Sequence, residues 1–308
     1  MAATLRFLGA ADVAALLPPA AEVLALAEAA LRKAADGGAS DGAGAWTARF
    51  DASGHPGVKA AAGAAAAGPG ALGGGALGAL SGPDGKLVLV VDGVAVATAR
   101  EAACTTLAAQ HLAAKDAEVV AILGCNARGR AVMDALVAQM HVERMLCFDP
   151  DVRAQAEFAD HIMQTHNVAS VVPPEPRECT EGAHIVVTCM RPPLPAPVVE
   201  KSWLQAGALC VALDVDNTFQ PATIAACVRR VTRSLAEWRA CASAGHFKGV
   251  PEPDTELAAL VAGKAPGRGE GKPLIAYMAV GAPAVEAAIA AELQRRAEKG
   301  NRGAVIPA

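Results

Sequence analysis

The feature that most constrains the fold is an alternation of short apolar runs with helical segments, which begins at residue 118. The runs 118–124, 143–149 and 184–189 are rich in Val, Ile and Leu and lack polar alternation, as strands buried on both faces do. The segments 127–140 and 152–166 have helical apolar spacing. We therefore predict a doubly wound α/β domain with a parallel sheet, whose ligands bind at the carboxyl ends of the strands.

Further elements are predicted on both sides of this alternation. The start of the chain is expected to form a strand and a helix. The other predicted elements are the helices 21–35, 98–114 and 283–298 and the strands within 83–93, 169–173, 208–214 and 227–234. Residues 60–82 are almost entirely Ala and Gly, which is typical either of a flexible linker or of a small-residue strand pair.

The composition excludes several classes of function. The net charge is -4 and aromatic residues make up 3% of the chain, without any basic run, so we expect no nucleic-acid partner. No apolar run reaches the roughly 20 residues of a membrane span, and we expect neither a membrane partner nor a signal peptide. The eight cysteines lack CxxC spacing, which favours buried thiols in a cytoplasmic protein. The seven histidines lack HExxH or paired spacing, so no metal site is predicted.

The segment ILGCNARGRA, residues 122–131, is close to a dinucleotide-binding turn. Gly124 stands where the first glycine makes the tight turn, and Gly129 where the third lets helix and strand pack closely. Asn126 replaces the middle glycine. Asparagine tolerates left-handed backbone angles, so the turn can form, but we expect its side chain to occupy space used by phosphate. The positive charges of Arg128 and Arg130 at the helix start partly offset this loss.

An acidic residue follows the next predicted strand. Asp149 lies 25 residues after Gly124, where a carboxylate accepts hydrogen bonds from the adenine ribose. A carboxylate also repels a 2′-phosphate, so the sequence favours NAD(H) over NADP(H). The alternative is a strand, turn and helix that bind no cofactor, with Asp149 as a surface residue.

Five segments in order resemble the ornithine cyclodeaminase/mu-crystallin family. They are KLVLVVDGVAVATAREAACTTLAAQHLA (86–113), EVVAILGCNARG (118–129), HIVVTCMRPPLPAPVVEKSWLQAGALCVALDVD (184–216), TELAALVAGKAPGR (255–268) and LIAYMAVGAPAVEAAIAAEL (274–293). The resemblance implies a homodimer, each subunit having a substrate-binding and dimerisation domain (1–113 with 277–308) and a Rossmann dinucleotide domain (114–276). It also implies hydride exchange at a carbon bonded to nitrogen, beside a carboxylate, in a small amino or imino acid.

The resemblance assigns roles to individual residues. Asp214 matches the active-site aspartate, which manages protons at the C–N bond. Arg100 matches the arginine of "TA-x-R", near cofactor and substrate. Arg49 and Lys59 look like the residues that bind the substrate, and a guanidinium suits a carboxylate. The resemblance also indicates which residues line the cofactor. Ala127 and Arg128 would meet the pyrophosphate, Thr188 would line the cofactor after its strand, and Val211 through Asp214 would lie near the nicotinamide.

Several positions depart from the family pattern, and they cluster at the active site. Asn126 replaces a glycine, 60–82 replaces a segment with a polar group, Ala279 replaces a serine, and VDNTFQP follows Asp214 in place of a Pro-Gly-Lys-like turn. Three functions therefore stay open. They are an imino- or amino-acid reductase or dehydrogenase of the ketimine type, an ammonia-releasing cyclodeaminase that recycles NAD+, and a catalytically impaired small-molecule-binding protein.

Overall fold

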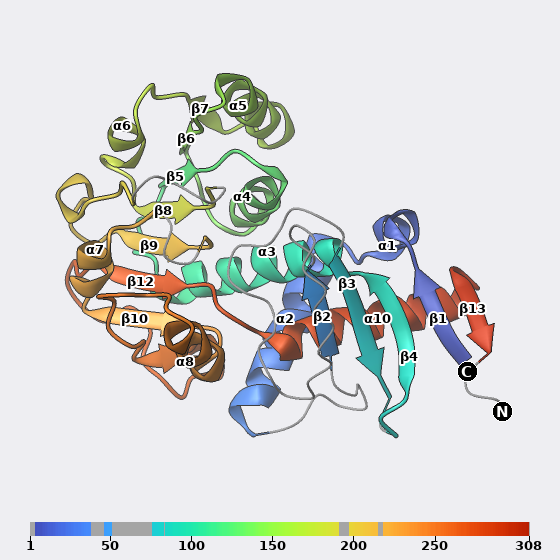
Figure 1. Ribbon diagram of the computed structural model, residues 1–308. Helices are drawn as coiled ribbons and strands as arrows, with labels where there is room; N and C mark the ends of the chain where they lie inside the picture. The colour runs from blue at the N-terminus through green and yellow to red at the C-terminus, as the bar shows by residue number, and fades with distance from the viewer. Residues whose placement is uncertain are drawn as a thin grey trace. The chain divides into compact units, whose positions relative to one another are not determined.

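The chain forms two compact units, seen in a computed structural model that describes residues 4–37, 46–50, 76–82, 84–190, 197–214 and 218–307. The first unit comprises 1–103 with 282–308, and the second comprises 104–281 (Figure 1). The domain boundaries expected at 113/114 and 276/277 differ from those of the compact units by ten residues at the first crossing and by five at the second. One crossing falls within helix α3 (Gly93–Leu112) and the other just before α10 (Pro283–Lys299).

The second unit is built on an eight-stranded sheet in which every pairing is parallel. The strand order is β11-β10-β12-β9-β8-β5-β6-β7. The strands are β5 (Val119–Leu123), β6 (Arg144–Phe148), β7 (Ala169–Val171), β8 (Ile185–Thr188), β9 (Leu209–Ala212), β10 (Arg229–Thr232), β11 (Thr255–Glu256) and β12 (Ile275–Met278). This confirms the predicted parallel α/β fold.

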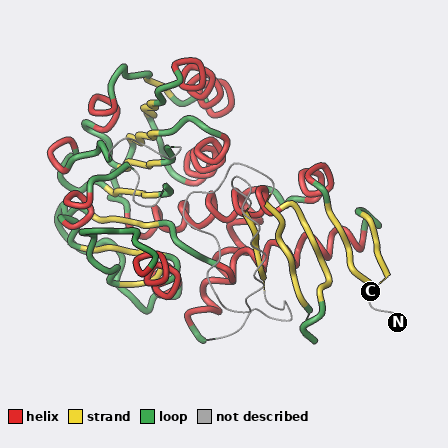
Figure 2. The backbone as a smooth tube through the Cα atoms, viewed as in Figure 1, coloured by secondary structure: helices red, strands yellow, loops and turns green. Residues whose placement is uncertain are grey.

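Helices cover both faces of this sheet. They are α4 (Ala127–Gln139), α5 (Val152–His166), α6 (Pro176–Thr180), α7 (Pro221–Ala225), α8 (Leu235–Ser243) and α9 (Leu257–Val261), with a short 3-10 turn η1 (Lys201–Trp203). Figures 1 and 2 show α4 and α5 on one side of the strands and α6 and α7 on the other. The sheet is therefore covered on both faces, as the apolar runs predict.

The middle of the sheet explains why those runs lack polar alternation. Every residue of β8, β9 and β12 is buried, so both faces of each strand need apolar side chains. The chain meets this need with Val, Ile, Leu, Ala, Cys and Met, while Thr188 and Tyr277 each carry a hydroxyl. All eight cysteines are buried free thiols, which confirms that they act as small hydrophobic side chains and not as a disulfide framework.

The first unit is a five-stranded mixed sheet with helices packed on one face. The strand order is β13-β1-β4-β3-β2. Its elements are β1 (Thr4–Leu8), α1 (Ala10–Leu16), α2 (Ala20–Ala35), β2 (Trp46–Phe50), β3 (Ala76–Ser81), β4 (Leu87–Asp92) and β13 (Ala304–Pro307), with α10 and part of α3. Helix α10 packs on α2, and Arg296 of α10 forms a 2.6 Å ion pair with Glu22 of α2.

The two faces of this sheet differ in what they present. Leu80, Leu89 and Val91 are buried. Strand alternation places Phe7, Leu77 and Ile306 together on the opposite face, where each is at least 40% exposed. One face of the first unit therefore carries exposed large apolar side chains.

Some elements differ from the predictions. Helix α3 begins at Gly93 and not near Thr98, because the Asp92 carboxylate accepts the Val94 N–H and starts the helix early. The end of the Ala/Gly stretch forms strand β3, and residues 60–75 lie outside the described residues. No single helix within the described ranges is long and apolar enough to cross a membrane, although α1 and α2, bent by 90° at their break, meet that test as a pair.

Candidate cofactor and active site

The turn between β5 and α4 lies where the strand order reverses. From β5 the sheet continues through β6 in one direction and through β8 in the other, and ligands of such folds bind at this switch point. Gly124 has a φ of 109°, and a Cβ there would lie 2.4 Å from the carbonyl carbon and oxygen of Cys189. A Cβ on Gly129 would lie 2.7 Å from the Gly124 oxygen. Both positions thus require glycine for the reasons that the fingerprint predicts.

Asn126 acts as the N-cap of α4. Its Oδ1 accepts the Gly129 N–H at 3.1 Å, and its Nδ2 donates to the Cys189 carbonyl at 2.6 Å. Its backbone is extended, with φ -114° and ψ 177°, so the expectation that asparagine supplies a left-handed turn residue is wrong. The asparagine instead caps the helix and ties it to the end of β8. One amide of the first helical turn is thereby used inside the protein.

Arg128 also reaches across the switch point. Its Nη1 donates to the Leu213 carbonyl at 3.0 Å, and its Nε lies 3.2 Å from the Cys189 sulfur. The guanidinium therefore points toward the ends of β8 and β9, whereas Ala127, the first residue of α4, is exposed. Arg128 keeps positive charge beside the turn and also links the turn to the loop after β9.

Asp149 directly follows β6, as predicted, and its carboxylate is fixed by backbone groups. Oδ2 accepts the N–H of Cys125, which belongs to the cofactor turn, at 2.8 Å. Oδ1 accepts the Asp151 N–H at 2.9 Å. Because each carboxylate oxygen has two lone pairs, both oxygens keep capacity to accept a further hydroxyl. The side chain is half-buried, so its charge stands beside the turn in a defined orientation.

Asp214 follows β9 and is almost wholly buried, with 5% of its surface exposed. Oδ1 accepts from the Thr188 hydroxyl at 2.9 Å, and Oδ2 accepts from the Met190 N–H at 3.0 Å and from the Thr218 hydroxyl. These donors come from the end of β8 and from the segment after β9. Val211 is fully buried inside β9, and its carbonyl lies 3.5 Å from the Thr188 hydroxyl. The structure thus brings Thr188 and Asp214 into direct contact.

Burial changes the acidity of this carboxyl group. Desolvation raises the pKa of Asp214 above its ordinary value, because burial penalises the charged form. The hydrogen bonds from its three donors and the charge of Arg128 lower the pKa and so oppose that effect. A buried carboxyl with a raised pKa can hold and release a proton closer to neutral pH than an exposed one.

The remaining predicted site residues belong to the first unit. Arg100, 13% exposed, pairs with two buried carboxylates, Glu101 at 2.8 Å and Glu286 at 3.1 Å. Arg49 lies in β2 opposite Leu77, with its side chain outside the described part of the chain. Lys59 lies outside the described residues altogether. Their predicted contacts with a substrate stay predictions.

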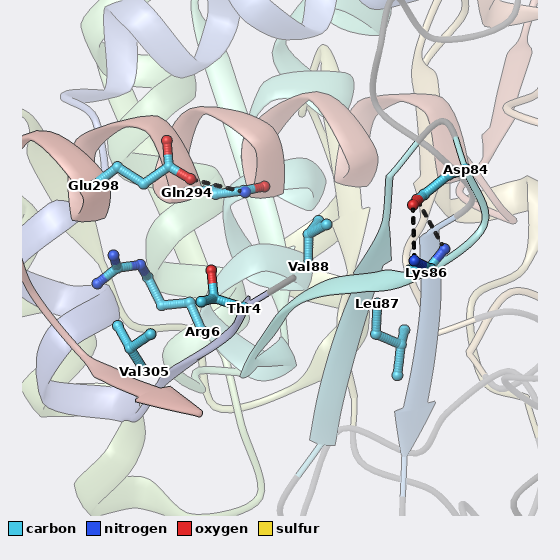
Figure 3. Close-up of a pocket in the computed structure, with 9 residues that line it drawn as sticks. All are labelled: Thr4, Arg6, Asp84, Lys86, Leu87, Val88, Gln294, Glu298 and Val305. Atoms are coloured by element: carbon cyan, nitrogen blue, oxygen red, sulfur yellow. Dashed lines mark hydrogen bonds and ion pairs between the residues drawn. The ribbon is translucent and has the colours of Figure 1, made fainter. Parts of the chain in front are cut away.

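Two hollows elsewhere lack any residue of the cofactor turn. One, of about 440 Å³ in the second unit, includes His184 and Gly207, which precede β8 and β9, so it lies at the amino edge of the sheet. The other, of about 240 Å³ in the first unit, is shown in Figure 3. Four of its polar side chains pair with one another, Lys86 with Asp84 at 3.8 Å and Gln294 with Glu298 at 3.0 Å. Neither hollow replaces the switch point as the candidate site.

Several groups at the site were missed by sequence reasoning. They are Cys189, the Met190 N–H, the Leu213 carbonyl and Thr218. Three of the four contacts are made by backbone groups, namely the Cys189 carbonyl, the Met190 N–H and the Leu213 carbonyl, which no side-chain motif reveals. Thr218, four residues after Asp214, is the one that a search for hydroxyl donors near a buried acid could have found.

Comparison with known proteins supports the resemblance to a family of dinucleotide-dependent proteins. Residues 70–301 match the model of the ornithine cyclodeaminase/mu-crystallin family. A Sinorhizobium fredii protein named as an uncharacterized cyclodeaminase is 28% identical over 71% of this chain and 68% of its own. The N-((2S)-2-amino-2-carboxyethyl)-L-glutamate dehydrogenase of Staphylococcus aureus is 24% identical over 71% of this chain and 67% of its own.

Solved structures share the fold over nearly the whole chain. The Δ1-pyrroline-2-carboxylate reductase of Thermococcus litoralis, solved with NADH and L-proline, has a TM-score of 0.76 at 17% identity, covering 97% of this chain and 99% of its own. An archaeal alanine dehydrogenase dimer with bound NAD has a TM-score of 0.73 at 18% identity, covering 98% and 99%. The family match spans most of the sequence and the switch-point turn lies within it, so the chain belongs to the ornithine cyclodeaminase/mu-crystallin family.

Proposed function

We propose that this protein is an NAD(P)-dependent oxidoreductase that acts on a C–N bond beside a carboxylate, as a reductase or dehydrogenase of a ketimine-type imino or amino acid. The observation that carries the proposal is the link between the cofactor turn and a buried carboxyl group. Arg128 of the turn binds the Leu213 carbonyl, one residue before Asp214. A dinucleotide turn and a proton-holding group thus stand in one connected network.

The residues of the turn fit a dinucleotide. Gly124 has a positive φ, both Gly124 and Gly129 make close contacts that leave no room for a Cβ, and the start of α4 supplies amide donors and positive dipole charge for a pyrophosphate. Asn126 reduces this supply, since its side chain already takes the Gly129 N–H. When bound, the nicotinamide cofactor supplies or accepts the hydride. We therefore expect binding with an affinity lowered by the asparagine.

The position of Asp149 supports NAD(H) over NADP(H). Its two oxygens are held by Cys125 and Asp151 N–H groups, so the carboxylate cannot turn away without losing both bonds. A ribose hydroxyl can donate to it, whereas a 2′-phosphate would meet its negative charge.

We assign to Asp214 the transfer of protons to and from the nitrogen of the substrate. The hydroxyls of Thr188 and Thr218 donate to the carboxylate, and either can relay a proton from the carboxyl only by turning to accept it while it gives up its own proton. Reduction of an imine needs one proton on nitrogen for each hydride added to carbon. Arg49, Lys59 and Arg100 are proposed to hold the substrate carboxylate, which a guanidinium can bind in bidentate fashion.

A second enzymatic function uses the same groups. In an amino-acid cyclodeaminase the hydride leaves and returns, ammonia is released on ring closure, and the cofactor shows no net change. The family contains cyclodeaminases, and the Sinorhizobium fredii relative bears that name. The departures at Asn126 and Ala279 motivate the third possibility, a small-molecule-binding protein without turnover.

The apolar face of the five-stranded sheet supports a homodimer. Phe7, Leu77 and Ile306 are exposed on this one face, on three different strands, and a patch of large apolar side chains is a common interaction surface. A second copy of the chain would present the same patch, as a two-fold interface requires.

One assay separates the three functions. The purified protein is incubated with NADH or NADPH and a panel of cyclic ketimine carboxylates, or 2-oxo acids with amines, and in parallel with NAD+ and diamino acids. Consumption of reduced cofactor with the first panel supports the reductase. Ammonia release from diamino acids without net cofactor change supports the cyclodeaminase. Cofactor binding without either reaction supports the non-catalytic protein and contradicts both enzymes.

A further inference from the structure

Two histidines and an aspartate converge between α4 and α5, on helices of the second unit. The Nε2 atoms of His161 and His166 each lie 2.8 Å from the same atom, Oδ1 of Asp134. The ligand atoms of all three side chains lie within 4.8 Å of one another. These side chains keep 27%, 17% and 35% of their surface exposed, in the order His161, His166, Asp134, so an ion and a water molecule can reach them.

We propose that this cluster is a binding site for a divalent ion of the zinc class, held by His161, His166 and Asp134 with water in the fourth position. Two imidazoles and a carboxylate are ligands that suit zinc. Tetrahedral bonds of roughly 2.0–2.1 Å place ligand atoms about 3.3 Å apart. The nitrogen and oxygen atoms therefore need to separate by only about 0.5 Å to admit the ion.

The protons of the cluster can rearrange to allow this. Both Nε2 atoms lie within hydrogen-bond distance of Asp134 Oδ1, which accepts from a ring that carries its proton on Nε2. Coordination through Nε2 moves that proton to Nδ1 by exchange with water, and no proton is lost from a neutral ring. The Nδ1 of His161 lies 3.5 Å from the Thr165 hydroxyl, which can accept a hydrogen bond from the Nδ1–H and so orient the ring.

The location indicates a structural ion and not a catalytic one. Helices α4 and α5 both begin at the carboxyl edge of the sheet, because each follows its strand. At about 1.5 Å per residue, Asp134 lies about 10 Å along α4 and His161 about 14 Å along α5 from that edge. The ion would join two helices well away from the cofactor turn. It would stabilise the native protein, since a ligand bound only to the native state raises stability.

The test uses the tag-free full-length protein, treated with a chelator and then titrated with Zn²⁺ by calorimetry and with Co²⁺ by visible absorption. Three variants are compared: Asp134→Asn, which keeps a hydrogen-bond acceptor of the same shape, His161→Ala, and His141→Ala as the control. His141 belongs to a second group, with Glu118 and Glu143, that is more exposed, at 77% for His141.

The expected result is one Zn²⁺ per chain in the wild type and in His141→Ala, with the intense absorption of tetrahedral Co²⁺ and a raised melting temperature. Asp134→Asn and His161→Ala should bind Zn²⁺ at least roughly 100-fold more weakly. This loss exceeds the roughly 10–100-fold that is typical when a residue that only hydrogen-bonds to a metal ligand is replaced. Circular dichroism of the metal-free variants shows whether each is folded. Absence of stoichiometric binding in the wild type, or binding that persists in both folded variants, would overturn the proposal. NADH binding serves as an independent readout that the metal should leave unchanged.

Discussion

The Arg128 guanidinium donates a 3.0 Å hydrogen bond to the Leu213 carbonyl, and this contact joins the cofactor turn to the loop that carries Asp214. One arginine therefore has two effects. It links the start of α4 to the loop after β9, and its charge lowers the pKa of a carboxyl group whose pKa burial raises. Substitutions at the turn and at the buried carboxyl can separate these effects.

Stability should fall with rising pH because of Asp214. Its native pKa is raised, so the protonated form favours folding, and this contribution is complete below the unfolded-state value near 4. It is lost as pH rises through the native pKa, and it amounts to about 1.4 kcal/mol for each pH unit by which the native pKa exceeds the unfolded one. Asp214→Asn should remove this slope, and Arg128→Met should steepen it, since the lowering charge is gone. Urea unfolding at a series of pH values measures both, with the exposed Asp160→Asn as control. An unchanged slope in Asp214→Asn contradicts the assignment.

Gly124→Ala should destabilise the protein far more than Gly182→Ala. Both glycines have positive φ, 109° and 75°, so both substitutions carry a left-handed penalty of about 1–2 kcal/mol. Only the Cβ at position 124 collides with backbone, at 2.4 Å from Cys189, whereas nothing lies within 4 Å at Gly182. The collision should add about 1–3 kcal/mol and weaken NADH binding. Equal melting temperatures for the two variants would show that the turn does not pack as described.

Asp149→Asn should shift cofactor preference toward NADP(H). The amide oxygen can still accept the Cys125 N–H of the turn, although the bond from the Asp151 N–H is lost, and the charge that opposes a 2′-phosphate is removed. The ratio of NADPH to NADH affinity should rise by at least about tenfold, which corresponds to 1.4 kcal/mol. Fluorescence titration measures the ratio. Asp151→Asn is the matched control, because Asp151 caps α5 and should change the ratio little. A ratio that stays constant in Asp149→Asn excludes the proposed ribose contact.

Phe7→Glu should disrupt the proposed homodimer. It places a charge in the exposed apolar face of the five-stranded sheet, where a closed interface would have to desolvate it. Sedimentation velocity should show a dimer for the wild type and a monomer for the variant. Val152→Glu, at a position 73% exposed in α5, is the control and should stay dimeric. A monomeric wild type, or a dimeric Phe7→Glu, contradicts this interface.

The sequence predicted the second unit well because its strands are buried on both faces. Runs such as 118–124 are then apolar throughout, and glycines such as Gly124 and Gly129 mark the ends that must pack closely. Strand β13 was missed, since all four residues are exposed at a sheet edge and its pairing with β1 joins opposite ends of the chain.

The site was harder to predict because its contacts are long-range. Asn126 and Arg128 both bind carbonyl oxygens, of Cys189 and Leu213, which no side-chain pattern reveals. The capping role of Asn126 could have been anticipated, since asparagine is among the residues most favoured at the N-cap of a helix. The resemblance to a family supplied Asp214 and Thr188 as candidates, and the structure adds that they touch.

The most direct test follows the hydride itself. The protein is incubated with NADH that carries deuterium at the transferred position and with the panel of cyclic ketimine carboxylates, and the amine product is analysed by mass spectrometry. We expect deuterium on the carbon bonded to nitrogen, formed much more slowly by Asp214→Asn although that variant binds NADH as the wild type does. If NADH binds and no product gains deuterium, or if Asp214→Asn transfers it at the wild-type rate, the proposed chemistry is contradicted.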